Sequence, residues 1–179
     1  MGPLDDLCEM GFERKDILVT SDAVFSLPDG NRKVGEVILR GMGIDPERPV
    51  IGFALRHWKG EDRFIPEFAR AADGLKAAFG AQILFVPFQF PSDREVSDAV
   101  LGQMENSRDV FILPRKLSTK EYLDLMASLR LLVGMRLHAL VFAALPACLL
   151  WRFLMIPSGP FCRWDERNRC RYHRCHHGR

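Results

Sequence analysis

Two side chains that can bind an anion or carry a proton, Arg136 and His138, lie in the otherwise apolar stretch of residues 131–146. This stretch predicts a short buried strand, a sharp turn at Gly134 and an apolar helix that ends before Pro146. Backbone N–H groups and the positive end of the helix dipole point outward where such a helix begins. The pair therefore indicates an anion site with acid–base chemistry. The alternative is an arginine that reaches out to solvent and a hydrogen-bonded core histidine.

A second cationic cluster begins at Arg56, directly after a continuous apolar run over residues 49–55. Such a run predicts a strand buried on both faces. The carboxyl ends of parallel strands meet at one edge of a sheet, so Arg56 and Arg136 are expected to face one crevice. A guanidinium can donate two hydrogen bonds at once to a carboxylate or phosphate, so the two arginines suit a small, multiply charged acid. The alternative for Arg56 is a solvated loop arginine.

Four further polar or aromatic side chains fall near the same expected edge. His57 follows Arg56 but should point to the opposite face, so we interpret it as structural. Trp58 could stack on a sugar or cover the sheet edge. Gln89 and Asp93 follow the next strand, and Asp93 could bind a hydroxyl group or cap a helix.

Apolar runs alternate with amphipathic segments along the chain, which predicts an α/β fold with a Rossmann-like parallel sheet and crossover helices. Ser92 and Glu95, and likewise Ser118 and Glu121, have the spacing of a capping box at a helix start. Strands are expected over residues 49–55, 82–88, 109–113, 129–133 and 147–151, and helices over residues 62–79, 92–104, 118–126 and 134–145.

The 179 residues suffice for one domain with a sizeable core, and we expect three parts. Residues 1–48 are interpreted as the remnant of an N-terminal domain and a linker. They hold a short strand at residues 16–20 and a helix with Val34, Val37, Ile38 and Met42 on its apolar face. Residues 49–151 are expected to form a Rossmann-like domain that binds the anionic ligand at its sheet edge. Residues 152–179 are a basic tail rich in Cys, His and Arg, which we expect to be disordered or read out of frame.

The tail contains side chains that bind zinc elsewhere, but no apolar residues are placed to support a folded knuckle, so no metal site is expected. Nucleic-acid binding by the basic tail is the weakest alternative, and none is expected. The side chains with metal-like spacing are Cys162, Cys170, His173, Cys175, His176 and His177.

Three further patterns bear on localisation. No signal peptide is visible, and the five cysteines are an odd number, which favours reduced thiols in the cytoplasm. The apolar run near the C-terminus is interrupted by Arg136, His138, Pro146 and Arg152, so no membrane span is expected.

Three segments together resemble the polysaccharide pyruvyl transferase family, most closely the C-terminal part of its bacterial cell-surface (CsaB-type) branch. They are IGFALRHW at residues 51–58, ILFVPFQ at residues 83–89 with Asp93, and VGMRLHALVFAA at residues 133–144. The Gly-Met-Arg-Leu-His run is the most specific of them.

The resemblance implies two Rossmann-like domains in the GT-B arrangement, of which this chain holds the C-terminal half. Members transfer an enolpyruvyl unit from phosphoenolpyruvate to a sugar, leave a cyclic pyruvate ketal and release phosphate. The resemblance implies no cofactor, and its partners are phosphoenolpyruvate and a glycan or lipid-linked saccharide acceptor, met in the cytoplasm at the inner membrane face. His138 would be the catalytic acid–base, Arg56, Arg136 and Leu137 would bind the donor, and Trp58, Gln89 and Asp93 would be acceptor or loop contacts.

The sequence departs from the family at both ends. Most of the N-terminal domain is absent, and the Arg/Cys/His-rich tail replaces the family's continuation after Leu145. We therefore expect a truncated fragment that is inactive alone. Two alternatives stay open: a non-catalytic module that binds an anion or a sugar nucleotide, and a non-functional gene fragment.

Overall fold

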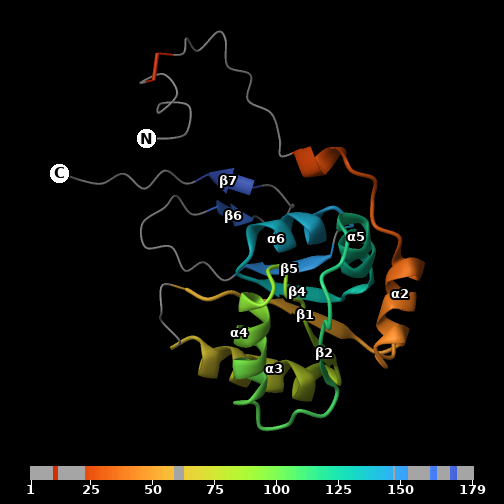
Figure 1. Cartoon of the computed structure of the whole chain (residues 1–179), viewed down its shortest axis with the longest axis vertical. Coiled ribbons are helices and arrows are strands. Elements are labelled where there is room, and N and C mark those ends of the chain that lie inside the picture. Colours follow the sequence, from red (N-terminus) through yellow and green to blue (C-terminus); the bar gives the residue numbers. More distant parts are fainter. Residues whose placement is uncertain are drawn as a thin grey trace, which may run out of the picture.

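The computed structural model describes residues 10–11, 23–58, 63–146, 148–152, 162–164 and 170–172. A 3₁₀ turn, η2, leads into alternating helices and strands (Figure 1). The elements are η2 (Ala23–Ser26), α2 (Arg32–Gly41), β1 (Val50–Ala54), α3 (Ile65–Phe79), β2 (Gln82–Phe85), α4 (Ser92–Leu101), β3 (Val110–Ile112), α5 (Thr119–Ser128), β4 (Leu131–Gly134), α6 (Leu137–Ala144), β5 (Leu149–Arg152), β6 (Cys162–Trp164) and β7 (Cys170–Tyr172).

Five strands form one parallel sheet in the order β3-β2-β1-β4-β5. The predicted Rossmann-like α/β fold is therefore confirmed. β1 and β2 are buried along their whole length, as their continuous apolar sequences require. β1 lies at the centre, and its Ala54 is the register partner of Gly134 in β4. The two cationic clusters therefore follow neighbouring strands.

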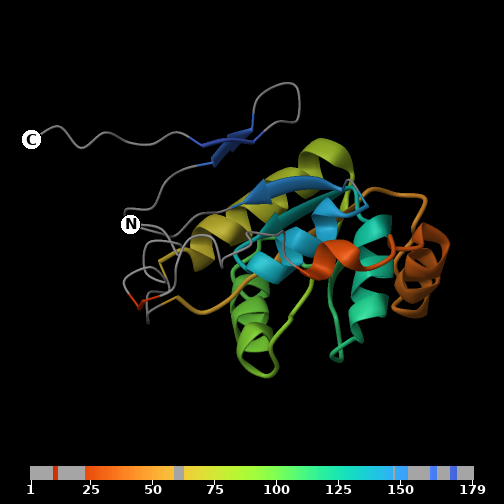
Figure 2. The same cartoon turned by 90° about the horizontal axis from the view of Figure 1, so that it is seen from above.

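The sheet separates two apolar cores, and helices cover both faces (Figures 1 and 2). On one face α3 and α4 pack Phe68 and Val96 against Phe53 and Phe85 of the strands. On the other face α2, α5 and α6 pack against the alternate strand residues, such as Leu84 and Leu132. Because all five strands are parallel, the carboxyl ends of β1, β2 and β4 lie at one edge of the sheet.

α2 lies beside α5 in both views (Figures 1 and 2). A Cβ atom at Gly35 would overlap the carbonyl oxygen of Asp124, so glycine lets the two helices approach closely. The predicted apolar face of this helix is only partly right. Val34 and Val37 are 42% and 64% exposed, because the buried face of α2 contains Gly35 and Leu39 instead.

The two predicted capping boxes have different outcomes. At α5 the hydroxyl of Ser118 accepts from the backbone of Glu121, whose carboxylate accepts in return from the Ser118 backbone, as predicted. At α4 the prediction is wrong, because the helix already includes Ser92 and has no side-chain cap at its N-terminus.

The end regions are only partly described. The strand expected at residues 16–20 lies outside the described residues, as do His173, Cys175, His176 and His177. We expected no secondary structure in the tail, but β6 and β7 pair there as short antiparallel strands. Cys162 and Cys170 begin these two strands.

Candidate functional site

The carboxyl ends of β1 and β4 form the rim of the sheet at which Arg56 and Arg136 lie. From β1 the chain passes through α3 to β2, whereas from β4 it passes through α6 to β5 in the opposite direction. In open α/β sheets such a switch in direction opens the crevice where ligands bind. Met135 N donates to Ala54 O at 2.9 Å, so the backbones that carry the two arginines are neighbours. The structure therefore places both arginines at one edge, as predicted.

The turn from β4 into α6 is tight because it contains Gly134. A Cβ atom there would lie 2.9 Å from Cδ2 of Leu140, so a larger residue would push α6 away from the strand. Arg136 is the N-cap residue, and α6 begins at Leu137. The rim consequently receives the N-terminal end of this eight-residue helix.

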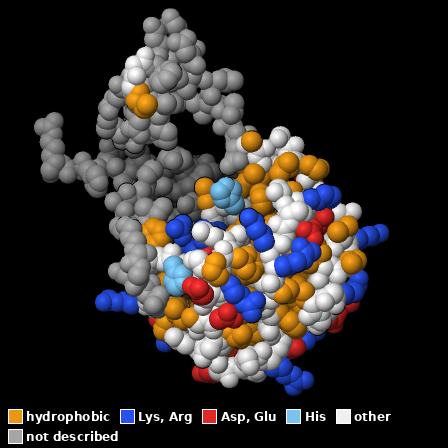
Figure 3. All heavy atoms as spheres, viewed as in Figure 1, with side chains coloured by type: hydrophobic (Ala, Val, Ile, Leu, Met, Phe, Trp, Pro, Cys, Tyr) orange, Lys and Arg blue, Asp and Glu red, His pale blue; other side chains and the backbone are white. Residues whose placement is uncertain are grey.

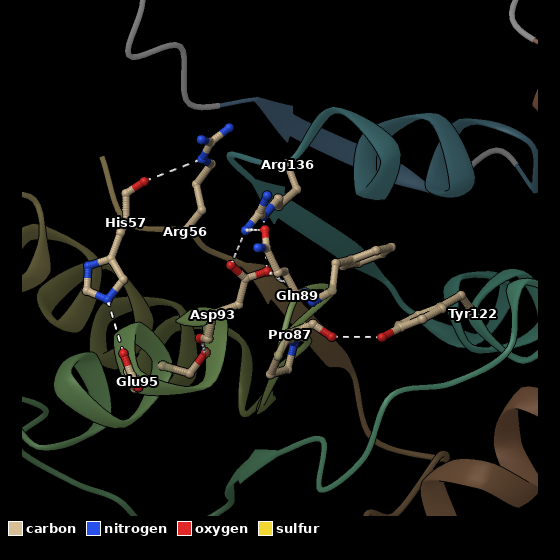
Figure 4. A network of polar contacts seen from close by, with 10 residues as sticks. Arg56, His57, Pro87, Gln89, Asp93, Glu95, Tyr122 and Arg136 are labelled. Carbon is tan, nitrogen blue, oxygen red and sulfur yellow. Dashed lines mark hydrogen bonds and ion pairs between the residues drawn. The ribbon is translucent and has the colours of Figure 1, made fainter. Parts of the chain in front are cut away.

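The Arg136 side chain is held in place by residues that follow β2 (Figure 4). Its Nε donates to Oδ2 of Asp93 at 3.0 Å, and its Nη2 donates to Oδ1 of Asp93 and to Oε1 of Gln89. We call these contacts of Asp93 and Gln89 with Arg136 the clamp. Because β1 lies between β2 and β4, the clamp crosses the end of β1. The Arg136 side chain remains 20% exposed, whereas that of Asp93 is fully buried.

Arg56 has fewer partners than Arg136. Its Nε donates to His57 O at 3.4 Å, and its guanidinium carbon lies 5.8 Å from the centre of the Trp58 ring. Its two η nitrogens have no hydrogen-bond partner among the described residues, and no carboxylate there forms an ion pair with it.

The neighbouring His57 points to the side opposite Arg56, as predicted (Figure 4). His57 Nε2 lies 3.8 Å from Oε2 of Glu95 at the start of α4. This contact ties the end of β1 to α4.

His138 lies in the first turn of α6, two residues after Arg136, and is exposed. Leu137, the residue between them, is 60% exposed. The alternative of a buried core histidine is therefore wrong. Figure 3 shows the molecule from the same side as Figure 1, and on this face histidine side chains lie among those of lysine and arginine.

The loop that carries Gln89 is held in place by α5, which belongs to the core on the α2, α5 and α6 face of the sheet. Tyr122 of α5 donates its hydroxyl to Pro87 O at 2.8 Å, and its ring stacks on that of Phe88 with centroids 4.4 Å apart. Burial of the hydroxyl raises the pKa of Tyr122, so it stays a neutral donor. This contact fixes the loop between β2 and α4 from which the clamp is built.

The residues expected as acceptor contacts lie at the same edge. Trp58 is half-buried, and the Arg56 guanidinium lies over its ring. Gln89 is exposed, and its amide oxygen accepts a hydrogen bond from Arg136. Asp93 is buried, and its contacts are with Arg136 and two backbone N–H groups. The pairing of Asp93 with Arg136 was not foreseen, because the two residues are 43 positions apart and nothing in the sequence marks them as partners.

The opposite edge of the sheet holds a pocket of about 350 Å³ that also contains arginines. Arg32 pairs with Glu36 at 3.0 Å, and Arg48 pairs with Asp109 at 3.0 Å. Cys148 lines this pocket, and burial raises the pKa of its thiol to about 11. The thiol is therefore protonated at neutral pH and is not a nucleophile there.

Within the described ranges, no group of three or more His, Cys, Asp or Glu side chains is arranged to hold a metal ion. The same part of the chain has no helix with the length and apolar character needed to cross a bilayer.

Solved structures of similar fold come from sugar enzymes. The ADP-heptose lps heptosyltransferase II of E. coli matches with a TM-score of 0.60 and 14% identity over 75% of this chain and 41% of its own. The UDP-GlcNAc 2-epimerase of Methanocaldococcus jannaschii matches with a TM-score of 0.58 and 12% identity over 83% and 43%. These likenesses show the fold, and such neighbours have the GT-B arrangement. The chain spans about two fifths of each.

No curated protein sequence matches the chain. A sequence profile of one family does match it, over residues 7–145, which include both arginines, the clamp and His138. Because this profile spans more than half of the chain, the chain belongs to the polysaccharide pyruvyl transferase family.

Proposed function

We propose that the rim binds phosphoenolpyruvate, and that the complete enzyme uses it to form a pyruvate ketal on a cell-surface polysaccharide sugar. The observation that carries this proposal is the juxtaposition of Arg56, Arg136 and the N-terminus of α6 at the switch point of the sheet. Phosphoenolpyruvate carries a carboxylate and a phosphate. Two guanidinium groups and a helix N-terminus are suitable partners for these two anions.

In the proposed reaction His138 donates a proton to the methylene carbon of the donor, which leaves C2 as an oxocarbenium ion. A sugar hydroxyl attacks C2 and loses its proton, and the C–O bond to phosphate then breaks. Attack by a second hydroxyl closes the ketal and releases a second proton. One proton ends in the new methyl group and one in the released phosphate, so the step balances. A histidine suits the first transfer because it can carry a proton near neutral pH.

The acceptor in this proposal is a glycan or lipid-linked saccharide, met in the cytoplasm at the inner membrane face. Trp58 and Gln89 lie beside the donor arginines, where an acceptor sugar would have to approach C2. The reaction needs no cofactor, since the donor supplies both the carbon unit and the leaving group. Because the chain spans about two fifths of the structures it matches, turnover should be assayed in a full-length family member with the same Arg-Leu-His run.

Calorimetry on this chain tests the donor site without requiring turnover. The proposal predicts saturable binding of phosphoenolpyruvate, with weaker binding of a sugar nucleotide such as UDP-glucose. The reverse preference would support a module that binds sugar nucleotides and would reject the proposal. Circular dichroism and a melting curve should accompany the titration to show that the chain is folded.

A further inference from the structure

Asp93 is a fully buried carboxylate on which four donors converge (Figure 4). Phe88 N and Gln89 N donate to its Oδ2 at 3.1 and 2.9 Å, and Nε and Nη2 of Arg136 donate to its two oxygens. The two backbone donors fix the carboxylate relative to the loop after β2. The carboxylate in turn fixes the arginine that follows β4.

We propose that Asp93 is a positioning residue, which holds Arg136 so that the Nη1 edge of its guanidinium faces the donor's anion. This inference rests on the proposed function, since it concerns the same donor site. The clamp occupies Nε and Nη2 of Arg136 with Asp93 and Gln89. Nη1 has no hydrogen-bond partner among the described residues, so it is the nitrogen left to bind a ligand.

The physical gain from such a clamp is preorganisation. A free arginine side chain loses rotamer freedom when a ligand immobilises it, and this cost weakens binding. Asp93 and Gln89 hold the Arg136 guanidinium in one geometry, so this ordering cost does not fall on the ligand. Arg56 has no comparable clamp, because its guanidinium contacts only the His57 carbonyl and the Trp58 ring among the described residues. The two arginines therefore differ: Arg136 is held by a buried carboxylate, whereas Arg56 forms no ion pair with any carboxylate of the described residues.

The substitution Asp93→Asn tests the role, with Asp98→Asn as the matched control. Asp98 lies on the same helix, is exposed and pairs with Arg94 rather than with Arg136. Two quantities are measured: the ¹H–¹⁵N signal of the Arg136 Nε in the free protein, and the affinity for phosphoenolpyruvate by calorimetry. Asp93→Asn should abolish the slowly exchanging Arg136 signal and weaken binding at least about tenfold. Asp98→Asn should change neither quantity.

A second variant keeps the test valid if Asp93→Asn fails to fold. Arg136→Lys retains the positive charge but cannot form the two-pronged contact with Asp93. A positioning role predicts that Arg136→Lys loses as much affinity as Arg136→Gln. Near-normal binding by Arg136→Lys would show that charge alone suffices, and it would overturn the inference.

The outcomes separate this inference from the proposed function. Normal or tighter binding by a folded Asp93→Asn protein would overturn the positioning role and leave the donor site standing. Tighter binding in particular would mean that Asp93 competes with the anion for Arg136. No binding by the wild-type protein, despite a slowly exchanging Arg136 Nε, would reject the donor site itself and the inference with it.

Discussion

The two edges of the sheet both gather arginines, yet they differ in what those arginines contact. At the amino edge Arg32 and Arg48 are paired with Glu36 and Asp109. At the carboxyl edge α6 begins, Arg56 has no ion-pair partner among the described residues, and Arg136 is clamped by a buried carboxylate. A cluster of cations therefore does not define an anion site. Under the proposed function the anion site needs three features together: a guanidinium without an ion pair among the described residues, a helix N-terminus and a fixed geometry.

The largest expected effect comes from removing the proton carrier at the carboxyl edge. His138→Ala in a full-length family member should lower phosphate release by about 10²–10⁴-fold and leave donor binding largely unchanged. His57→Ala is the comparison, because His57 turns away toward Glu95. The assay is release of phosphate from phosphoenolpyruvate over a panel of sugar acceptors. Unchanged turnover in His138→Ala would reject its role as the acid.

The next prediction compares an arginine from each edge. Arg56→Gln should weaken phosphoenolpyruvate binding by about 10–150-fold, because a charge-assisted hydrogen bond contributes about 1.5–3 kcal/mol. Arg130→Gln is the control, since Arg130 is an exposed arginine that lines the pocket at the amino edge. Calorimetry measures both variants. Equal losses in the two would show that general positive charge attracts the donor, and the contrast between the edges would fail.

The close approach of α6 to β4 gives a stability test. Gly134→Ala should destabilise the protein by about 1–3 kcal/mol, because the new methyl group meets Leu140 in a packed core. Gly74→Ala in α3 meets nothing within 4 Å and should stabilise by about 0.5–1 kcal/mol. Urea denaturation measures both changes. A stable Gly134→Ala variant would mean that α6 can shift away from the strand at little cost.

The smallest effect is a pH dependence at the start of α5. The Arg115 hydrogen bond, with help from Ser118, holds the pKa of Glu121 at about 2, below its usual 4.5. Because the folded pKa is the lower one, this contribution to stability is complete above pH 4.5 and is lost as the pH falls toward 2. Arg115→Gln should therefore flatten the loss of unfolding free energy over that range. An identical pH profile in the variant would contradict the assignment.

The sequence predicted the sheet and the edge where the arginines meet, because continuous apolar runs and alternating helices specify parallel crossovers. It could not predict the clamp, because Asp93 reaches Arg136 across β1 and the order of strands in the sheet is a tertiary property. The spacing of Ser92 and Glu95 was misleading for a related reason. At the turn into α4 the buried carboxylate of Asp93 bonds back to the preceding loop, and no side chain caps the helix.

The face of α2 shows the same limit. Its valines have helical spacing, but docking depends on Gly35, which brings α2 against Asp124 of α5. Apolar periodicity identifies a helix well, whereas the choice of buried face depends on the partner helix. The partner is only known once the chain has folded.

The most direct test is an experimental structure of the chain with phosphoenolpyruvate. We predict that the ligand lies beyond the carboxyl ends of β1 and β4, with its anionic groups within hydrogen-bond distance of Arg56 and of Nη1 of Arg136. The account would be contradicted if phosphoenolpyruvate bound instead in the pocket of Arg32 and Arg48 and made no contact with Arg56 or Arg136.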